Sequence, residues 1–355
     1  MRLRSGFACL AALTAAAAFP QSREAAVQKA LDAYVAEHHL VGASAAVLER
    51  DGTHFETGSG FQDREAKTRA SARTVYRLGS ISKPVTAVAA MQLVESGKLS
   101  LFAPVAALVP EWPHKEAGIT LRHLLTHTSG IRHYAAGKSD VFFEPFTVKS
   151  SLDVFKDDPL LFQPGAKVSY STHAFSLVAR LVEIAGGGNF AEIVRRRVAA
   201  PAGAQSLRLE DRSKPDPARS ALYELSALNV ALRQTREENI SWKSGGGGME
   251  ASAPDLARFA MAVLENRLLR PQTTDFMFQR QIIDGLDTGR GLGWALDAKG
   301  NPVHGGAQQG CRSYLAIDRK AGRVVAVMTN TGGNHPIHEL AQAVASAWSA
   351  TTTRR

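Results

Sequence analysis

The stretch Arg77-Leu-Gly-Ser80-Ile-Ser82-Lys83-Pro84 is the segment of the chain that says most about its fold and chemistry. Pro84 lacks a backbone N–H, so a helix tolerates it only in the first turn, where that donor is unpaired anyway. Apolar residues then recur with helical spacing, which predicts a helix over Pro84–Ser96 that begins near Ser80. Residues three positions apart share one helix face, so the Lys83 amine can reach the Ser80 hydroxyl.

This pairing suits nucleophilic catalysis. A serine hydroxyl is a weak nucleophile and needs a base. A lysine amine can be that base only if burial or nearby positive charge lowers its pKa. The N-terminus of a helix also favours negative charge at Ser80. An S-x-x-K pattern alone is too short to be specific. A serine that caps the helix N-terminus, followed by a surface lysine, would give the same pattern.

Strand-like segments lie near both ends of the chain. Helical periodicity covers Ser22–Glu37, and two strand-like runs follow on either side of Asp51–Gly52, a hairpin turn signal. Between Leu101 and Asn266 the pattern is mostly helix and loop. The elements expected after that region are strands over Gly291–Leu296, Ser313–Asp318 and Val324–Thr329, a turn at Arg319–Gly322, and a helix over His338–Ser349; the early strands are Ala43–Leu48 and Thr53–Gly58.

Neither end alone has enough strands for a stable sheet. We therefore expect an α/β (α+β) fold in which one antiparallel sheet is built from both ends and flanked by the terminal helices. The sheet part would comprise about residues 21–80 and 285–350, and residues 81–284 would form an inserted, mostly helical part. A site is expected in the cleft between the two parts.

Three further segments follow the S-x-x-K motif: Leu124-Leu-Thr-His-Thr-Ser-Gly130, Tyr170-Ser-Thr172 and His304-Gly305-Gly306. In this order and spacing the four segments resemble the family of class C β-lactamases, D,D-peptidases and related esterases. Ser129-Gly-Ile-Arg-His-Tyr134 is especially similar to the mitochondrial serine β-lactamase-like proteins and their bacterial relatives. The resemblance extends over roughly Ala26 to Trp348 and implies a β-lactamase/transpeptidase-like fold.

The resemblance also implies roles for individual residues. Ser80 would be the nucleophile, Lys83 its base, and Tyr170 a second acid/base that passes a proton to the leaving group. No metal or other cofactor is implied. The remaining implied site residues are Thr172, His304, Gly305 and Gly306 for substrate binding, and the backbone N–H groups of Ser80 and Ala307 for the oxyanion hole.

Two residues depart from the lactamase pattern. The lactamases of the family carry asparagine where this chain has Thr172, and lysine where it has His304. Threonine offers one hydroxyl in place of an amide, and histidine is largely neutral at pH 7. These two changes weaken the recognition of a β-lactam, whereas the residues for acyl transfer are retained. We therefore expect a serine hydrolase that forms an acyl-enzyme on ester, amide or peptide bonds. The alternative is a non-catalytic penicillin-recognising or scaffold protein of the same fold.

Other motifs have competing interpretations. His123, His127 and His133 could suggest zinc, but no glutamate accompanies the His123/His127 pair as a metalloprotease base. Gly245–Gly248 lacks the strand and the Gly-Lys-Ser/Thr continuation of a phosphate-binding loop. Close backbone packing or a mobile cleft loop explains these glycines better, and the adjacent Trp242 would line the pocket or pack in the core.

Composition limits the partners. The 355-residue chain has a formal net charge of +9 but no basic stripe with interleaved aromatic residues, which argues against nucleic acid. A positive surface would attract anionic substrates or cell-envelope polymers, and its usual role is only solubility. The partners that we expect are a small-molecule or peptide substrate and a cell-envelope polymer. The oligomeric state cannot be deduced from the sequence.

The beginning of the chain is typical of an export signal. Arg2 and Arg4 precede an apolar segment over residues 7–19, and small residues suit cleavage near residues 18–21. We therefore expect residues 1–20 to be a signal peptide, residues 21–355 to be the hydrolase domain, and the protein to be secreted or periplasmic. A mitochondrial presequence is the alternative. Cleavage would leave Cys311 as the only cysteine, expected to be a buried packing residue.

Overall fold

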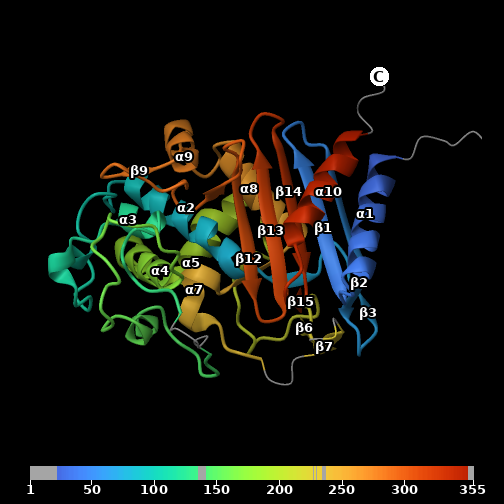
Figure 1. Cartoon of the computed structure of the whole chain (residues 1–355), viewed down its shortest axis with the longest axis horizontal. Helices are drawn as coiled ribbons and strands as arrows, with labels where there is room; N and C mark the ends of the chain where they lie inside the picture. The colour runs from blue at the N-terminus through green and yellow to red at the C-terminus, as the bar shows by residue number, and fades with distance from the viewer. Residues whose placement is uncertain (1–21, 135–140, 227, 229, 234–236, 351–355) are drawn as a thin grey trace, which may run out of the picture.

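The centre of the molecule is a seven-stranded antiparallel sheet assembled from both ends of the chain (Figure 1). The computed structural model describes residues 22–134, 141–226, 228, 230–233 and 237–350, so the expected signal peptide lies outside the described residues. The strand order is β11-β12-β13-β14-β1-β2-β3. These strands are β1 (Gly42–Glu49), β2 (His54–Asp63), β3 (Thr68–Arg69), β11 (Ala295–Leu296), β12 (Pro302–Gln308), β13 (Cys311–Asp318) and β14 (Arg323–Thr329).

The terminal helices cover one face of this sheet. Helices α1 (Arg23–Glu37) and α10 (Ile337–Ala350) contact each other and lie against β1, β13 and β14. Leu31 of α1 and Trp348 of α10 are fully buried there, and the Trp348 ring stacks on Phe55 of β2 with centroids 6.3 Å apart. The antiparallel sheet flanked by terminal helices, predicted from the sequence, is confirmed.

Helix α8 (Ala253–Leu264) covers the opposite face and contacts β1, β13 and β14. It lies within residues 81–284, the stretch expected to form the inserted part, yet it packs directly on the sheet. Its side chains are apolar along nearly the whole helix, with Phe259 fully buried, so it needs an apolar partner.

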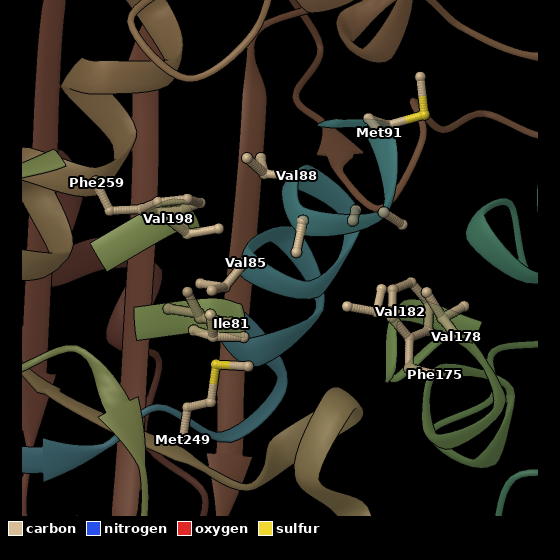
Figure 2. Close-up of a cluster of buried hydrophobic side chains, with 14 of the residues drawn as sticks. Ile81, Val85, Val88, Met91, Phe175, Val178, Val182, Val198, Met249 and Phe259 are labelled. Carbon is tan, nitrogen blue, oxygen red and sulfur yellow. The ribbon is translucent and has the colours of Figure 1, made fainter. Parts of the chain in front are cut away.

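Helix α2 (Ser82–Glu95) is buried at the junction of the two parts of the molecule. In Figure 2 the helix lies between two groups of apolar residues, and the side chains of Ile81, Val85 and Val88 are on the side of the first group. One group includes Val198 and Phe259, and the other is Phe175, Val178 and Val182 of α4 (His173–Gly186). Pro84 is the third residue of α2, so the predicted helix start is confirmed. At the other end, Gly97 follows the helix with φ +70°.

Two predicted strands differ from the structure by more than two residues at one end. Strand β2 continues to Asp63, five residues beyond the predicted end. The predicted strand Gly291–Leu296 is reduced to β11, because Gly293 has φ +77° and packs against α2. A Cβ at Gly293 would lie 2.4 Å from the Cβ of Ala87. The chain therefore turns tightly there before it joins the sheet.

Short elements complete the fold, and none of the described helices is long and apolar enough to cross a membrane. The remaining helices are α3 (Leu121–Leu125), α5 (Phe190–Val194), α6 (Ala200–Ala202), α7 (Ser244–Gly247) and α9 (Pro271–Phe278). The remaining strands are β4 (Val75–Arg77), β5 (Arg208–Leu209), β6 (Tyr223–Leu225), β7 (Ala231–Arg233), β8 (Met249–Ser252), β9 (Ile282–Ile283), β10 (Leu286–Asp287) and β15 (Thr331–Gly332).

Candidate active site

Ser80 lies in a single 3₁₀ turn, Gly79–Ile81, that leads directly into α2. Gly79 has φ +53°, and a Cβ there would lie 2.7 Å from the amide nitrogen of Ala307 on β12. Only glycine allows this close approach without strain. The sequence Leu78-Gly-Ser80 thus brings the hydroxyl-bearing residue next to the strand that was expected to share the oxyanion hole with it.

The amine of Lys83 lies between three oxygen atoms. Its Nζ is 3.2 Å from Ser80 Oγ, 3.1 Å from Thr172 Oγ1 and 2.7 Å from the Gly246 carbonyl oxygen. A neutral amine has two N–H groups and one lone pair. The Gly246 carbonyl can only accept and Thr172 Oγ1 can accept, so the lone pair remains for the Ser80 O–H. This arrangement prepares Lys83 to remove the proton of Ser80.

The electrostatic surroundings favour that neutral amine. Lys83 is fully buried, and burial is the main cause that holds its pKa well below the ordinary lysine value. The positive charges of Lys243 and Arg290 lower the pKa further. No carboxylate within the described part of the chain forms an ion pair with Lys83, in contrast to the surface lysines Lys156 and Lys214.

Tyr170 lies beside Lys83 just before α4, with its ring centroid 4.7 Å from Lys83 Nζ. Burial raises the pKa of Tyr170, while its hydroxyl–hydroxyl hydrogen bond with Ser80 lowers it to a smaller extent. The phenol therefore keeps its proton at neutral pH. It can donate that proton and accept another, which suits a relay more than a permanent base.

The β12 edge forms another wall of the site. Strand β11 pairs only with Pro302 and Val303 of β12. The rest of β12, from His304 to Gln308, extends beyond β11, and β12 contacts the Ser80 turn. Gly305 and Gly306 line a cleft of about 570 Å³ together with Ser80 and Ala307. The other residues lining this cleft are Arg312, Tyr314 and residues 334–338 at the start of α10.

His304 does not line that cleft. Its side chain is buried, and its Nδ1 donates to the Gly305 carbonyl oxygen at 2.8 Å. Burial, with a contribution from Lys83, lowers the pKa of His304 to about 3. A neutral imidazole at this position supplies no charge to hold a carboxylate. Thr172 is likewise occupied, because its hydroxyl accepts from Lys83.

The three histidines considered for zinc each accept a backbone N–H at Nδ1. The donors are Thr120 for His123, Ser171 for His127 and Thr172 for His133, at 3.1 to 3.2 Å. His127 and His133 thereby position the Tyr170–Thr172 segment. Across the described ranges, no group of three or more His, Cys, Asp or Glu side chains is placed to hold a metal ion.

The glycine run packs α7 against α4. A Cβ at Gly245 would lie 2.3 Å from the Phe175 carbonyl oxygen, and one at Gly246 would lie 2.7 Å from Thr172 Cγ2. Close packing, one of the two interpretations of these glycines, is therefore what the structure shows. Trp242 is fully buried and so is a core residue. Cys311 is also buried, and burial raises its pKa to about 12, which makes it a packing thiol.

Several site residues carry no signal in the sequence. The Gly246 acceptor is a backbone carbonyl, so its side chain could not reveal it. Lys243 ends a 3₁₀ turn, Glu238 and Arg290 lie outside the helices and strands, and none of the three belongs to a motif. Arg77 belongs to the quoted stretch, yet its buried bidentate pair with Glu210, at 2.7 Å, depends on tertiary structure.

Comparison with known proteins identifies the family of the chain. The Beta-lactamase family model matches residues 27–347. Esterase EstB of Burkholderia gladioli is 30% identical, over 87% of this chain and 91% of its own length. Penicillin-binding protein 4 of Amycolatopsis lactamdurans is 32% identical, over 86% of this chain and 84% of its own length.

Solved structures show the same fold. A D-amino acid amidase from Ochrobactrum anthropi SV3, complexed with L-phenylalanine amide, superposes with a TM-score of 0.81. It is 20% identical, and the match covers 93% of this chain and 99% of that one. With its S-x-x-K turn, its sheet and the family match over nearly its whole length, the chain belongs to the Beta-lactamase family of serine hydrolases.

Proposed function

We propose that this protein hydrolyses ester or amide bonds through an acyl-enzyme on Ser80. The observation that carries the proposal is the environment of the Lys83 amine. It is buried, has two acceptors for its N–H groups, and lies 3.2 Å from the Ser80 hydroxyl. The relatives named for esterase and amidase activity support the same class of substrate.

The proposed chemistry has two acyl transfers. Ser80 Oγ attacks the carbonyl carbon while its proton passes to Lys83 Nζ. The backbone N–H groups of Ser80 and Ala307 stabilise the oxyanion, a contribution worth about 10²–10³ in rate per donor. As the bond to the leaving group breaks, Tyr170 gives that group a proton and is reprotonated from Lys83. Water then attacks the acyl carbonyl carbon while one of its protons passes to Lys83 Nζ. The bond between the acyl carbon and Ser80 Oγ breaks, Lys83 returns that proton to Ser80 Oγ, and the carboxylic acid is released.

Labelling with a fluorophosphonate probe tests the nucleophile. Wild-type protein should gain the mass of one phosphonyl group, and Ser80→Ala should not. Ser96→Ala, at the far end of α2, is the matched control and should label like the wild type. Equal labelling of Ser80→Ala would refute the assignment, and an unlabelled wild-type protein would favour the non-catalytic binding or scaffold alternative.

The substrate class follows from Thr172 and His304. Since His304 is neutral and the Thr172 hydroxyl is engaged by Lys83, neither offers strong recognition of a β-lactam carboxylate or side-chain amide. We expect kcat/KM for p-nitrophenyl butyrate or a D-amino-acid amide to exceed that for nitrocefin. A higher kcat/KM for nitrocefin would contradict this expectation.

We also propose that the protein is exported and acts in the periplasm or outside the cell, on small molecules, peptides or a cell-envelope polymer. The basic start and the apolar segment over residues 7–19 support export. N-terminal sequencing of the mature protein should place its first residue between 19 and 22. Recovery of an uncleaved cytoplasmic chain would contradict export.

A further inference from the structure

Lys243 is a second buried lysine close to the site, and the chemistry above does not use it. It ends the 3₁₀ turn Ser241–Lys243, directly before α7, whose Gly246 carbonyl accepts from Lys83. Its side chain runs beside Gly247, where a Cβ would lie 3.4 Å from Lys243 Cδ. The side chains of Lys243 and Lys83 therefore contact adjacent residues of α7, Gly247 and Gly246 respectively.

Burial lowers the pKa of Lys243, and the carboxylate of Glu238 opposes that shift and favours the charged amine. Lys243 Nζ lies 3.2 Å from Glu238 Oε1, and both side chains are less than 10% exposed. The ammonium also lies 4.9 Å from the Trp242 ring centroid and 6.0 Å from that of Tyr134. Glu238 in turn is fixed through its backbone, because its carbonyl accepts from Arg77 at 2.9 Å.

Apart from Lys243, the charged and titratable groups around Lys83 are either neutral or partly exposed to solvent. Burial keeps the phenol of Tyr170 protonated and the imidazoles of His127, His173 and His304 uncharged. Arg290 is a cation, with its guanidinium 5.7 Å from the Tyr170 ring centroid, but it is only partly buried and is screened by solvent. Around Lys243, Arg77 is paired with Glu210 and Cys311 is a neutral thiol.

We propose that Lys243 is a positioning residue that keeps the amine of Lys83 neutral by charge repulsion at α7, with Glu238 holding the Lys243 ammonium in place. This inference rests on the proposed function of Lys83 as the base for Ser80. It gives a physical reason for the Lys243–Glu238 pair inside the core. It also identifies a source of positive charge in a site where His304 provides none.

The first test is the pH dependence of Ser80 labelling by the fluorophosphonate. The double variant Lys243→Met/Glu238→Gln removes both charges and so leaves no unpaired charge in the core. Lys83 should then hold its proton to higher pH. The midpoint of the acidic limb of the rate–pH profile should move up by about one pH unit. At a given pH below that midpoint, the variant should be labelled about tenfold more slowly than the wild type.

Lys243→Arg is the matched control, because it keeps a cation next to Glu238 and should retain the wild-type midpoint. A variant that only loosens the packing would lower the rate at every pH without moving the midpoint. An unmoved midpoint in the double variant, or an equal displacement in Lys243→Arg, would overturn the proposal.

A second measurement does not depend on catalysis. Lysine labelled with ¹³C at Cε is introduced into the Ser80→Ala protein, and Lys83→Gln assigns the resonance of Lys83. The Lys83 titration should move to higher pH when Lys243→Met/Glu238→Gln is added. An unchanged titration would overturn the role of Lys243 whether or not the protein turns over substrate. If the titration moves but Ser80 is never labelled, only the hydrolase function fails.

Discussion

At the scale of single residues, the Thr172 hydroxyl is placed to orient the amine of Lys83, the proposed base. It accepts an N–H of Lys83 at 3.1 Å, and the Lys83 side chain is fully buried from solvent. Thr172→Val keeps the shape but leaves that N–H unpaired, at a cost of about 1–3 kcal/mol. We expect acylation of Ser80 in a single-turnover assay to slow by about tenfold to a hundredfold.

Thr172→Ser retains the hydroxyl and is the control for this prediction. It should acylate within a few-fold of the wild-type rate, because the acceptor for Lys83 is still present. Wild-type acylation in Thr172→Val would show that the hydroxyl does not orient the amine.

The residues of the site differ in how far the sequence reveals them. Ser80 and Lys83 are three positions apart beside Pro84, and local helix geometry is enough to bring them together. Tyr170 and Thr172 needed the family resemblance, because nothing local separates a catalytic tyrosine from a packed one. The Gly246 carbonyl could not be predicted, since every residue has a carbonyl and only the tertiary fold selects this one.

At the scale of elements, α7 is a short helix held against α4 by glycines. Gly246→Ala would place a Cβ 2.7 Å from Thr172 Cγ2 and 2.8 Å from the Thr172 carbonyl oxygen. Backbone atoms cannot yield as a flexible side chain does, so α7 must shift and take the acceptor of Lys83 with it. We expect kcat to fall by up to about a hundredfold, since displacements of about 1 Å in an active site have that effect.

Gly188→Ala is the matched control, because a Cβ there meets no atom within 4 Å. It should leave kcat unchanged. If Gly246→Ala had wild-type kcat and the same thermal midpoint, the close approach of α7 to α4 would not be needed for the position of Lys83.

Element boundaries show where local patterns stop being informative. Pro84 defines the start of α2 because its effect on backbone hydrogen bonding is local. The strand predicted over Gly291–Leu296 was too long because the packing of Gly293 against Ala87 of α2 is not visible in the pattern. The position of α8 on the sheet was also missed, since an apolar helix looks the same whether it covers a sheet or fills a helical region.

At the scale of the whole molecule, the two ends of the chain build the sheet and the middle supplies the nucleophile helix. The edge of β12 meets the Ser80 turn where these parts join (Figure 1). Helix α2 is buried on nearly all sides, so Lys83 and the adjoining Ser80 turn, the proposed base and nucleophile, are held rigidly. This packing buries polar groups, several histidines among them. The buried histidines make the free energy of unfolding depend on pH, and that dependence can be measured.

Burial lowers the pKa of His304 and His173 to about 3 and that of His335 to about 4, whereas an unfolded histidine titrates near 6.5. Between about pH 6.5 and pH 4, the unfolded chain therefore binds protons that the native protein does not. The free energy of unfolding should be highest above pH 6.5 and should fall by about 1.4 kcal/mol per pH unit for each histidine as the pH decreases. Urea unfolding at pH 7.5, 6 and 5 measures this slope.

His335 allows the slope to be assigned to one residue. Its Nδ1 accepts from the Tyr34 hydroxyl at 3.0 Å, and its Nε2 donates to the Thr331 carbonyl oxygen at 3.0 Å, so a proton on Nδ1 would reverse the hydrogen bond with Tyr34 of α1 and place a charge in the core. Glutamine at this position can accept and donate but does not titrate. His335→Gln should therefore reduce the slope between pH 6 and pH 5 by about the contribution of one histidine. An identical slope in wild type and His335→Gln would show that this histidine titrates equally in the folded and unfolded states.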